Sequence, residues 1–275
     1  KCLQAELSPL VGQEEWPALL ERAPLDLRVN VARVGRERLL ADFDGALPTP
    51  LSPWGIRLPS ATRVAVADPY LSGLVEVQDE GSQLIALACG PRDGETVIDL
   101  CAGAGGKSLA IAAAAPKAHI LAPDSNRARL SMLPDRAGRA GAIVETRFLN
   151  PPRELEELSQ WREAADLVLV DAPCYGSGTW RRNPEGRWRL TPDRLGRLAE
   201  VQERLLEIGA ELVRPGGRLV YAVCSLLSRE GAGQIERFLK RHSSWISEET
   251  PIPGGRMDGS GRLLTPGHDH TDGFF

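Results

Sequence analysis

From about residue 78 onward, apolar residues form short strand-like runs that alternate with longer stretches of helical spacing. We expect strands over 97–99, 120–121, 143–144, 167–171 and 219–223. We expect helices over 82–89, 108–115, 126–139, 153–161, 195–212 and 229–241. Strands that alternate with helices in this way predict an α/β fold built on a doubly wound, mostly parallel sheet.

The residues before this alternation show a different mixture of patterns. Helical spacing occurs over 13–22 and 36–43, and strand-like runs occur over 25–31, 55–58 and 64–66. Helices and short strands in this proportion predict a small α+β subdomain. We place it at residues 1–72, followed by the larger α/β domain at residues 73–275.

Composition narrows the class of protein. The 275 residues are 42% hydrophobic and 25% charged, which is ordinary for a globular protein. No apolar run approaches the ~20 residues that span a bilayer, so we expect no membrane association. The net charge of −4 argues against indiscriminate nucleic-acid binding but allows a local basic face. Five cysteines without a Cys-x-x-Cys pair favour a reducing, cytoplasmic location. The chain begins without Met, so we expect a fragment or a processed chain.

The stretch 95–108 reads as a strand, a glycine-rich turn and the start of a helix. Gly103, Gly105 and Gly106 let the backbone approach a ligand closely, and the helix directs free N–H groups towards it. A P-loop would need glycine where this chain has Cys101, and the dinucleotide-binding pattern fails at its last glycine. The loop alone therefore predicts only a nucleotide-like ligand.

Chemically reactive side chains follow the predicted strands. In a parallel sheet, ligands bind beyond the carboxyl ends of the strands. Those ends carry Cys101 to Lys107, Asp124, Asn150, Asp171 to Cys174, and Cys224 to Ser225. Asp124 follows the first loop glycine by about 20 residues, the spacing of an acid that accepts hydrogen bonds from ribose. The alternatives are a solvated acid at Asp124, and an NTPase-type acid at Asp171.

The cysteines divide into two groups. A free cysteine is usually a buried, inert hydrophobe, and we expect this of Cys2 and Cys89. Cys174 follows a proline and precedes two glycines, so it lies on a loop, and Cys224 ends a strand. These two thiols are candidates for chemistry.

Three motifs together resemble a known family. They are Asp99-Leu-Cys-Ala-Gly-Ala-Gly-Gly-Lys107, Asp171-Ala-Pro-Cys174 with Arg181-Arg182-Asn183-Pro184, and Leu219-Val-Tyr-Ala-Val-Cys224-Ser225. They resemble the signature motifs of the Sun-type RNA (cytosine-5) methyltransferases. Within that family the bacterial ribosomal RNA small-subunit methyltransferase B group is the most similar. The likeness runs from about residue 27 to the end of the chain.

The resemblance implies a Rossmann-like class I methyltransferase fold that binds S-adenosylmethionine. It implies methyl transfer to carbon 5 of a cytosine in RNA, with 16S ribosomal RNA the expected substrate and tRNA the alternative. It makes 73–275 the catalytic domain and 1–72 a subdomain of RNA-binding type. The implied cofactor contacts are Cys101, Ala102, Gly103, Ala104, Gly105, Gly106, Lys107, Asp124, Arg129, Asn150 and Asp171.

The resemblance also assigns Cys224 as the nucleophile and Cys174 as the residue needed for product release. A thiolate that adds to carbon 6 of cytosine makes carbon 5 reactive towards a sulfonium methyl group. Asp171, if protonated, could relieve the charge that develops at ring nitrogen 3. The chain departs from the family at Asn150, where Asp is usual, at Val223 and at Tyr175.

The segment 180–189 is basic and aromatic. Arginine contacts phosphates and tryptophan stacks on bases, so Arg181, Arg182, Arg187 and Trp188 are candidate RNA-binding residues. The alternative is a solvated surface with a packed tryptophan. His268 and His270 are too few for a metal site, and we expect none. We expect a monomer. Two further functions stay open: a catalytically idle RNA-binding protein of this fold, and a P-loop nucleotidase.

Overall fold

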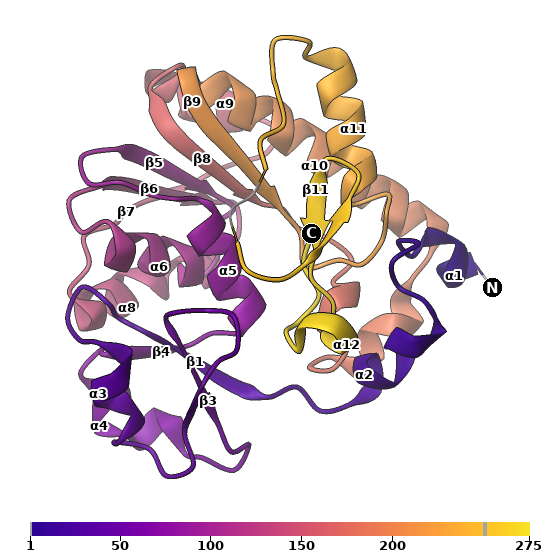
Figure 1. Ribbon diagram of the computed structural model, residues 1–275. Coiled ribbons are helices and arrows are strands. Elements are labelled where there is room, and N and C mark those ends of the chain that lie inside the picture. Colours follow the sequence, from indigo (N-terminus) through magenta and orange to yellow (C-terminus); the bar gives the residue numbers. More distant parts are fainter. Residues whose placement is uncertain (1, 250–251) are drawn as a thin grey trace. The chain divides into compact units, whose positions relative to one another are not determined.

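The chain divides into two units, and one of them contains residues 24–171 and 208–220. Its largest element is a five-stranded sheet (Figure 1). The computed structural model describes residues 2–249 and 252–275, with the side chains from residue 4 onward. Strand β5 (Thr96–Leu100) pairs in parallel with β6 (His119–Asp124) and with β8 (Ala165–Asp171), and β6 pairs in parallel with β7 (Glu145–Phe148). The order β7-β6-β5-β8-β9 ends with β9 (Val213–Ala222). The predicted doubly wound sheet is confirmed.

The order of the strands reverses between β5 and β8, because the chain first adds β6 and β7 on one side. Ligands of such sheets bind at this switch point, beyond the carboxyl ends of the strands. The central strands are apolar on both faces: Val97 and Ile98 of β5, and Leu167, Val168 and Leu169 of β8, have no exposed surface. Burial on both faces is what a continuous apolar run predicts for a parallel strand.

Helices cover the sheet. They are α5 (Glu80–Ala88), α6 (Gly106–Ala114), α7 (Arg127–Leu130), α8 (Leu133–Ala140), α9 (Glu154–Glu157), the 3-10 helix η3 (Ser159–Trp161) and the end of α10 (Pro192–Leu212), of which only residues 208–212 belong to this unit. Leu109 of α6 and Leu133 of α8 pack in one apolar cluster with Ala122 of β6. The prediction of one helix over 126–139 was wrong, because the chain breaks between α7 and α8. Pro134 lies in the first turn of α8, where a backbone N–H has no hydrogen-bond acceptor within the helix, so the missing N–H of proline costs no hydrogen bond.

A second, four-stranded antiparallel sheet precedes the large one in the same unit. Its order is β2-β3-β1-β4, and its strands are β1 (Leu25–Val29), β2 (Leu47–Pro48), β3 (Gly55–Leu58) and β4 (Val75–Val77). Helices α3 (Arg36–Leu40) and α4 (Asp68–Leu71) accompany it. The strand expected over 64–66 is instead a 3-10 helix, η2 (Val64–Val66). Leu27 and Ile56, both without exposed surface, centre its core.

The other unit contains residues up to 23, 172–207 and 221–275. Its elements are α1 (Cys2–Glu6), η1 (Gln13–Glu15), α2 (Trp16–Leu20), η4 (Ser177–Thr179), η5 (Pro184–Arg189), α11 (Ala232–Arg241), β10 (Arg256–Asp258), β11 (Gly261–Leu263) and α12 (Pro266–Asp269). The subdomain boundary expected at residue 72 stays a prediction. The expected RNA-binding role of 1–72 stays a prediction. Within the described residues, no helix is both long and apolar enough to cross a membrane.

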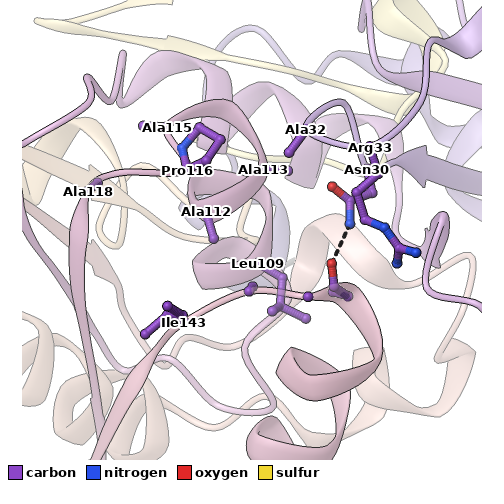
Figure 2. A pocket seen from close by; sticks show the side chains of 13 residues that line it. Asn30, Ala32, Arg33, Leu109, Ala112, Ala113, Ala115, Pro116, Ala118 and Ile143 are labelled. Atoms are coloured by element: carbon purple, nitrogen blue, oxygen red, sulfur yellow. Dashed lines mark hydrogen bonds between the residues drawn. The ribbon is translucent and has the colours of Figure 1, made fainter.

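Asn30, just after β1, links the small sheet to helix α8. Its side-chain amide donates to the carbonyl of Ala140 at the end of α8, at 2.8 Å, and to that of Gly73, at 3.1 Å. Figure 2 shows the first of these bonds beside a pocket of about 100 Å³, lined mainly by alanines. Asn30 is 8% exposed, and both of its hydrogen bonds are buried.

Replacing Asn30 with Ala removes this shared donor. We expect the free energy of unfolding to fall by about 1–3 kcal/mol, because two inward carbonyl groups lose a hydrogen bond. Ile143→Ala is the matched control: Ile143 lines the same pocket but is 91% exposed, and its loss should change stability by less than about 0.5 kcal/mol. Urea unfolding of both variants measures the difference. Equal stability of the two variants would contradict the role given to Asn30.

Candidate active site

The loop between β5 and α6 has an unusual backbone. Cys101, Gly103 and Gly105 all have left-handed backbone angles, with φ of 79°, 58° and 81°. A Cβ atom on Gly103 would lie 2.5 Å from the Arg129 guanidinium, and one on Gly105 would lie 2.4 Å from Leu133. Both positions therefore require glycine. Cys101 adopts the same region without being glycine, a strained conformation of the kind that concentrates at functional sites.

Asp124, at the end of β6, holds this loop in place. One carboxylate oxygen accepts the backbone N–H of Gly103 at 2.6 Å, and the other accepts that of Asn126 at 2.5 Å. The side chain is 7% exposed. The structure thus brings Asp124, Arg129 and the glycine loop together, as the cofactor prediction requires. Whether Asp124 also accepts from a ribose stays a prediction.

Two further acids lie at the ends of neighbouring strands. Lys107, in the first turn of α6, forms an ion pair with Asp171 at the end of β8, with 2.6 Å between Nζ and Oδ2. Asp99 of β5 accepts the Ser108 hydroxyl at 2.5 Å, and its second oxygen has no hydrogen-bond partner among the described residues. Burial raises the pKa of Asp99 to about 6. The three strand-end carboxylates, Asp99, Asp124 and Asp171, therefore have different environments.

Asn150, the remaining cofactor candidate, pairs with an acid that the sequence did not indicate. Its backbone N–H and its side-chain amide each donate to one carboxylate oxygen of Glu157, both at 2.8 Å. These bonds lower the pKa of Glu157. The amide oxygen of Asn150 takes no part in these two bonds. The two residues are seven positions apart, which places them on the same face if the segment is helical. That spacing is too common to have predicted the pair from the sequence.

In the other unit, the two candidate thiols meet. The Sγ atoms of Cys174 and Cys224 are 3.3 Å apart, although the residues are 50 positions apart in the chain. Both side chains are partly exposed. The hydrogen bond with Cys224, together with burial, holds the pKa of Cys174 well above its ordinary value. Either thiol can donate the hydrogen bond that joins them.

The other cysteines differ from this pair. Cys89 is 1% exposed, its thiol contacts the carbonyl of Ile85 at 3.3 Å, and burial raises its pKa. It has the inert environment that was expected. Burial likewise raises the pKa of Cys101. The side chain of Cys2 lies outside the described residues.

The backbone holds the two cysteine loops side by side. The N–H of Gly178 donates to the carbonyl of Cys224 at 3.1 Å, and that of Ala172 donates to Ala222 at 2.9 Å. A Cβ atom on Gly178 would lie 2.0 Å from the carbonyl oxygen of Gly273, so only glycine fits at this position of the loop. A buried acid, Glu230, also contacts both loops, and the sequence analysis missed it. A lone acid soon after Cys224 was the only signal.

The four RNA-binding candidates have different surroundings. Arg181 and Arg182 both form ion pairs with Asp272, which is 2% exposed. The Arg181 side chain is only 6% exposed. By contrast Trp188 is 82% exposed, and the Arg187 guanidinium lies 5.8 Å from the centre of its ring. Arg181 thus has a structural task that the sequence did not reveal, and its contact with RNA stays an untested prediction, as do the other three.

His268 and His270 flank Asp269 at α12, and His268 contacts it at 3.1 Å. Among the described residues there is no group of three or more histidines, cysteines or acids that could hold a metal ion. Asp269 itself is engaged by the backbone N–H groups of Gly255 and Thr265. The histidines therefore belong to a structural turn.

Comparison with known proteins gives consistent matches. The family model described as 16S rRNA methyltransferase RsmB/F matches residues 86–275. A relative from Salmonella newport (strain SL254), named ribosomal RNA small subunit methyltransferase B, is 35% identical over 273 residues. That match covers 95% of this chain and 61% of the relative. The chain therefore spans about three-fifths of the length of such relatives.

Two solved structures from Pyrococcus horikoshii share the fold. One, described as a methyltransferase homolog protein, is 26% identical and has a TM-score of 0.79, covering 98% of this chain and 90% of that one. The other, described as NSun6 with SFG, is 19% identical and has a TM-score of 0.84, covering 95% of this chain and 92% of that one. At that identity the second likeness concerns the fold alone.

The raised pKa of Asp99 predicts how stability depends on pH. Above pH 6 the carboxylate is charged in the folded and the unfolded chain, and the folded state bears the full cost of burying it. As pH falls from about 6 to its ordinary pKa of 3.8, only the folded state takes up the proton, and the cost disappears. We expect Asp99→Asn to be more stable than wild type at pH 8, by at most about 3 kcal/mol, and this advantage to vanish near pH 4.

Denaturant unfolding at several pH values measures this difference. Asp166→Asn is the contrasting control: the Thr96 N–H and the Arg214 guanidinium lower the pKa of Asp166, so that variant should be less stable than wild type at pH 8. Its deficit should shrink as pH falls. An advantage of Asp99→Asn that does not change with pH would contradict the prediction.

Proposed function

The chain belongs to the RsmB/F family of 16S rRNA methyltransferases, and on that basis we propose that it transfers a methyl group from S-adenosylmethionine to carbon 5 of a cytosine in 16S ribosomal RNA. Family membership confirms the resemblance that the motifs indicated. The observation that carries the proposed chemistry is the pair of thiols, Cys174 and Cys224, 3.3 Å apart. We further propose that the protein acts as a monomer in the cytoplasm.

The loop after β5 fits a nucleoside cofactor. Gly103 and Gly105 adopt left-handed backbone angles that glycine allows, and the N-terminus of α6 follows at once with free backbone N–H groups. S-adenosylmethionine supplies a methyl group on a positively charged sulfur. Asp124 and Asp171 at the strand ends would favour that charge. We propose that the loop, Asp124, Arg129, Asn150 and Asp171 hold the cofactor.

We propose Cys224 as the nucleophile that bonds to carbon 6 of the cytosine. The contact between the thiols supports this assignment, because a Cys174 thiol 3.3 Å away can donate a hydrogen bond to a Cys224 thiolate. After methylation, the proton on carbon 5 must leave and the bond to Cys224 must break. Cys174, once it has lost its own proton to solvent, assists by taking the proton from carbon 5. Asp171 would relieve the charge at ring nitrogen 3, with the Lys107 ammonium as the adjacent proton source.

The two cysteines should have opposite signatures when each is removed. Cys224→Ala should abolish methyl transfer and leave no covalent RNA–protein adduct. Cys174→Ala should also lose turnover, yet stall after methylation with RNA bonded to Cys224. A denaturing gel of each variant with substrate RNA and cofactor should then show a slow band for Cys174→Ala alone. Cys89→Ala, which removes the inert thiol, should behave as wild type.

The reverse pattern of bands would make Cys174 the nucleophile. The proposed function itself is tested by labelled methyl transfer from S-adenosylmethionine to a 16S ribosomal RNA transcript, with a tRNA transcript in parallel. Label in the ribosomal transcript supports the proposal, and label in tRNA alone would replace the substrate. A wild-type chain that binds RNA but transfers no label would be the idle RNA-binding protein.

The pairing of Asn150 with Glu157 changes what a substitution there should do. Asn150→Asp provides a charged acceptor for the adenine amine, which should strengthen that bond by about 1 kcal/mol. It also sets the new carboxylate against Glu157 and loses the amide donor. We therefore expect Asn150→Asp alone to bring no gain in S-adenosylmethionine affinity. Asn150→Asp with Glu157→Gln should bind the cofactor several-fold tighter than the single variant.

Titration calorimetry with S-adenosylmethionine measures these affinities. The matched control adds Glu156→Gln to Asn150→Asp, since Glu156 is an exposed neighbour that pairs with Arg153. If Glu157→Gln has no more effect than Glu156→Gln, Asn150 does not contact the cofactor.

A further inference from the structure

Glu230 is a charged residue with no exposed surface in the unit that carries the two cysteines. Its carboxylate accepts the backbone N–H of Tyr175 at 2.9 and 3.2 Å, one distance to each oxygen. It also accepts the hydroxyl of Ser225 at 2.6 Å and the side-chain amide of Gln202 at 3.0 Å. All these donors are themselves buried or nearly so.

The donors to Glu230 come from the immediate neighbours of both thiols. Tyr175 follows Cys174 in the chain, and Ser225 follows Cys224. Gln202 adds a second tie, because its amide also donates to the carbonyl of Pro173, the residue before Cys174, at 3.1 Å. One carboxylate thus contacts the loop of each cysteine.

Other bonds keep Glu230 itself from moving. The Tyr221 hydroxyl donates to the backbone carbonyl of Glu230 at 2.6 Å, and Gln234 orients Gln202 by donating to its amide oxygen at 3.0 Å. Ser225 is fixed in turn, since its hydroxyl lies 3.1 Å from that of Ser177 and accepts the N–H of Leu227. These bonds restrict the movement of the buried network around Glu230, although the amide oxygen of Gln234 has no hydrogen-bond partner among the described residues.

We propose that Glu230 is a positioning residue that clamps the Cys174 loop against the Cys224 loop and so keeps the two thiols within contact of each other. The proposal rests on the proposed function for its chemical purpose, although its geometry concerns this unit alone. Loss of the clamp separates Cys174 from Cys224, and the step that needs both, release of the methylated base, suffers most.

The charge of Glu230 has a second effect. Burial raises the pKa of Glu230, while the Ser225 hydroxyl, the Tyr175 N–H and the Gln202 amide oppose that rise. The same negative charge contributes to the raised pKa of Cys174. Glu230 therefore favours a protonated Cys174 beside a Cys224 that attacks.

The clamp can be measured without any methyl transfer. In a glutathione buffer, the two cysteine thiols react with one oxidised glutathione to give a protein disulfide and two reduced glutathione molecules. The ratio of reduced to oxidised glutathione at which half of the protein is disulfide-bonded is the thiol midpoint, and it reports the effective concentration of the two thiols. We expect Glu230→Ala to lower that effective concentration at least tenfold. Glu230→Gln, which keeps an acceptor for the Tyr175 N–H, should lie between this variant and wild type. Peptide mapping identifies Cys174 and Cys224 as the pair.

Glu15→Gln is the matched control. Glu15 is 4% exposed in the same unit and accepts from Arg256, Thr265 and Gly267, away from the cysteines. The Glu15→Gln variant should have the thiol midpoint of wild type, even if the substitution lowers the melting temperature of the protein. The kinetic counterpart is a lower kcat for Glu230→Ala, with KM for RNA changed less than threefold and with accumulated RNA adduct.

A folded Glu230→Ala chain with the wild-type thiol midpoint would overturn the proposal. So would Glu230→Gln and Glu15→Gln variants that lose the thiol pairing equally. If wild type transfers no methyl group, the proposed function fails, yet the glutathione midpoint still decides whether Glu230 is a clamp.

Discussion

The short loop between β5 and α6 is the constraint on which the carboxyl-end edge of the large sheet depends. Between a parallel strand and the helix that packs against the same sheet, the chain must reverse its direction within a few residues. Here Cys101, Gly103 and Gly105 adopt left-handed angles to make that turn. The turn presents the N–H of Gly103 to Asp124 and starts α6 so that Lys107 reaches Asp171. Larger side chains at either glycine would meet Arg129 or Leu133 and open the loop.

The acids around this loop show how one sheet edge makes similar groups differ. Asp124 receives two backbone N–H groups, and Asp171 receives an ammonium group. Asp99 receives one hydroxyl and is otherwise buried, which raises its pKa to about 6. Hydrogen bonds and a cation favour the charged form, and burial opposes it. Sequence places three aspartates at strand ends, but only the folded surroundings separate their roles.

Local patterns predicted the order of strands and helices because each buried strand is a continuous apolar run. They failed where an element is short or exposed. The strand expected over 143–144 begins instead at Glu145, since Ile143 is 91% exposed and β7 is an edge strand with no fully buried position. The motifs also predicted which strand-end residues cluster. They could not predict Asp272 as the partner of Arg181, or Glu230 as the link between two loops. Those contacts join residues that are 91 and 55 positions apart, beyond any local periodicity.

Electrostatics requires the two thiols to act in turn. Two unit charges 3.3 Å apart repel by about 5 kcal/mol at an effective dielectric constant of about 20. Both cysteines therefore cannot be thiolates together, and the proton that one loses is held more firmly by the other. In the proposed reaction Cys224 ionises first, with Cys174 as its hydrogen-bond donor. Once Cys224 is bonded to carbon it can no longer become a thiolate, so its charge no longer opposes the ionisation of Cys174. Cys174 can then lose its own proton to solvent and accept the proton from carbon 5. The contact between the thiols thus sets the sequence of the two steps, which is why a clamp that keeps them together matters to the chemistry.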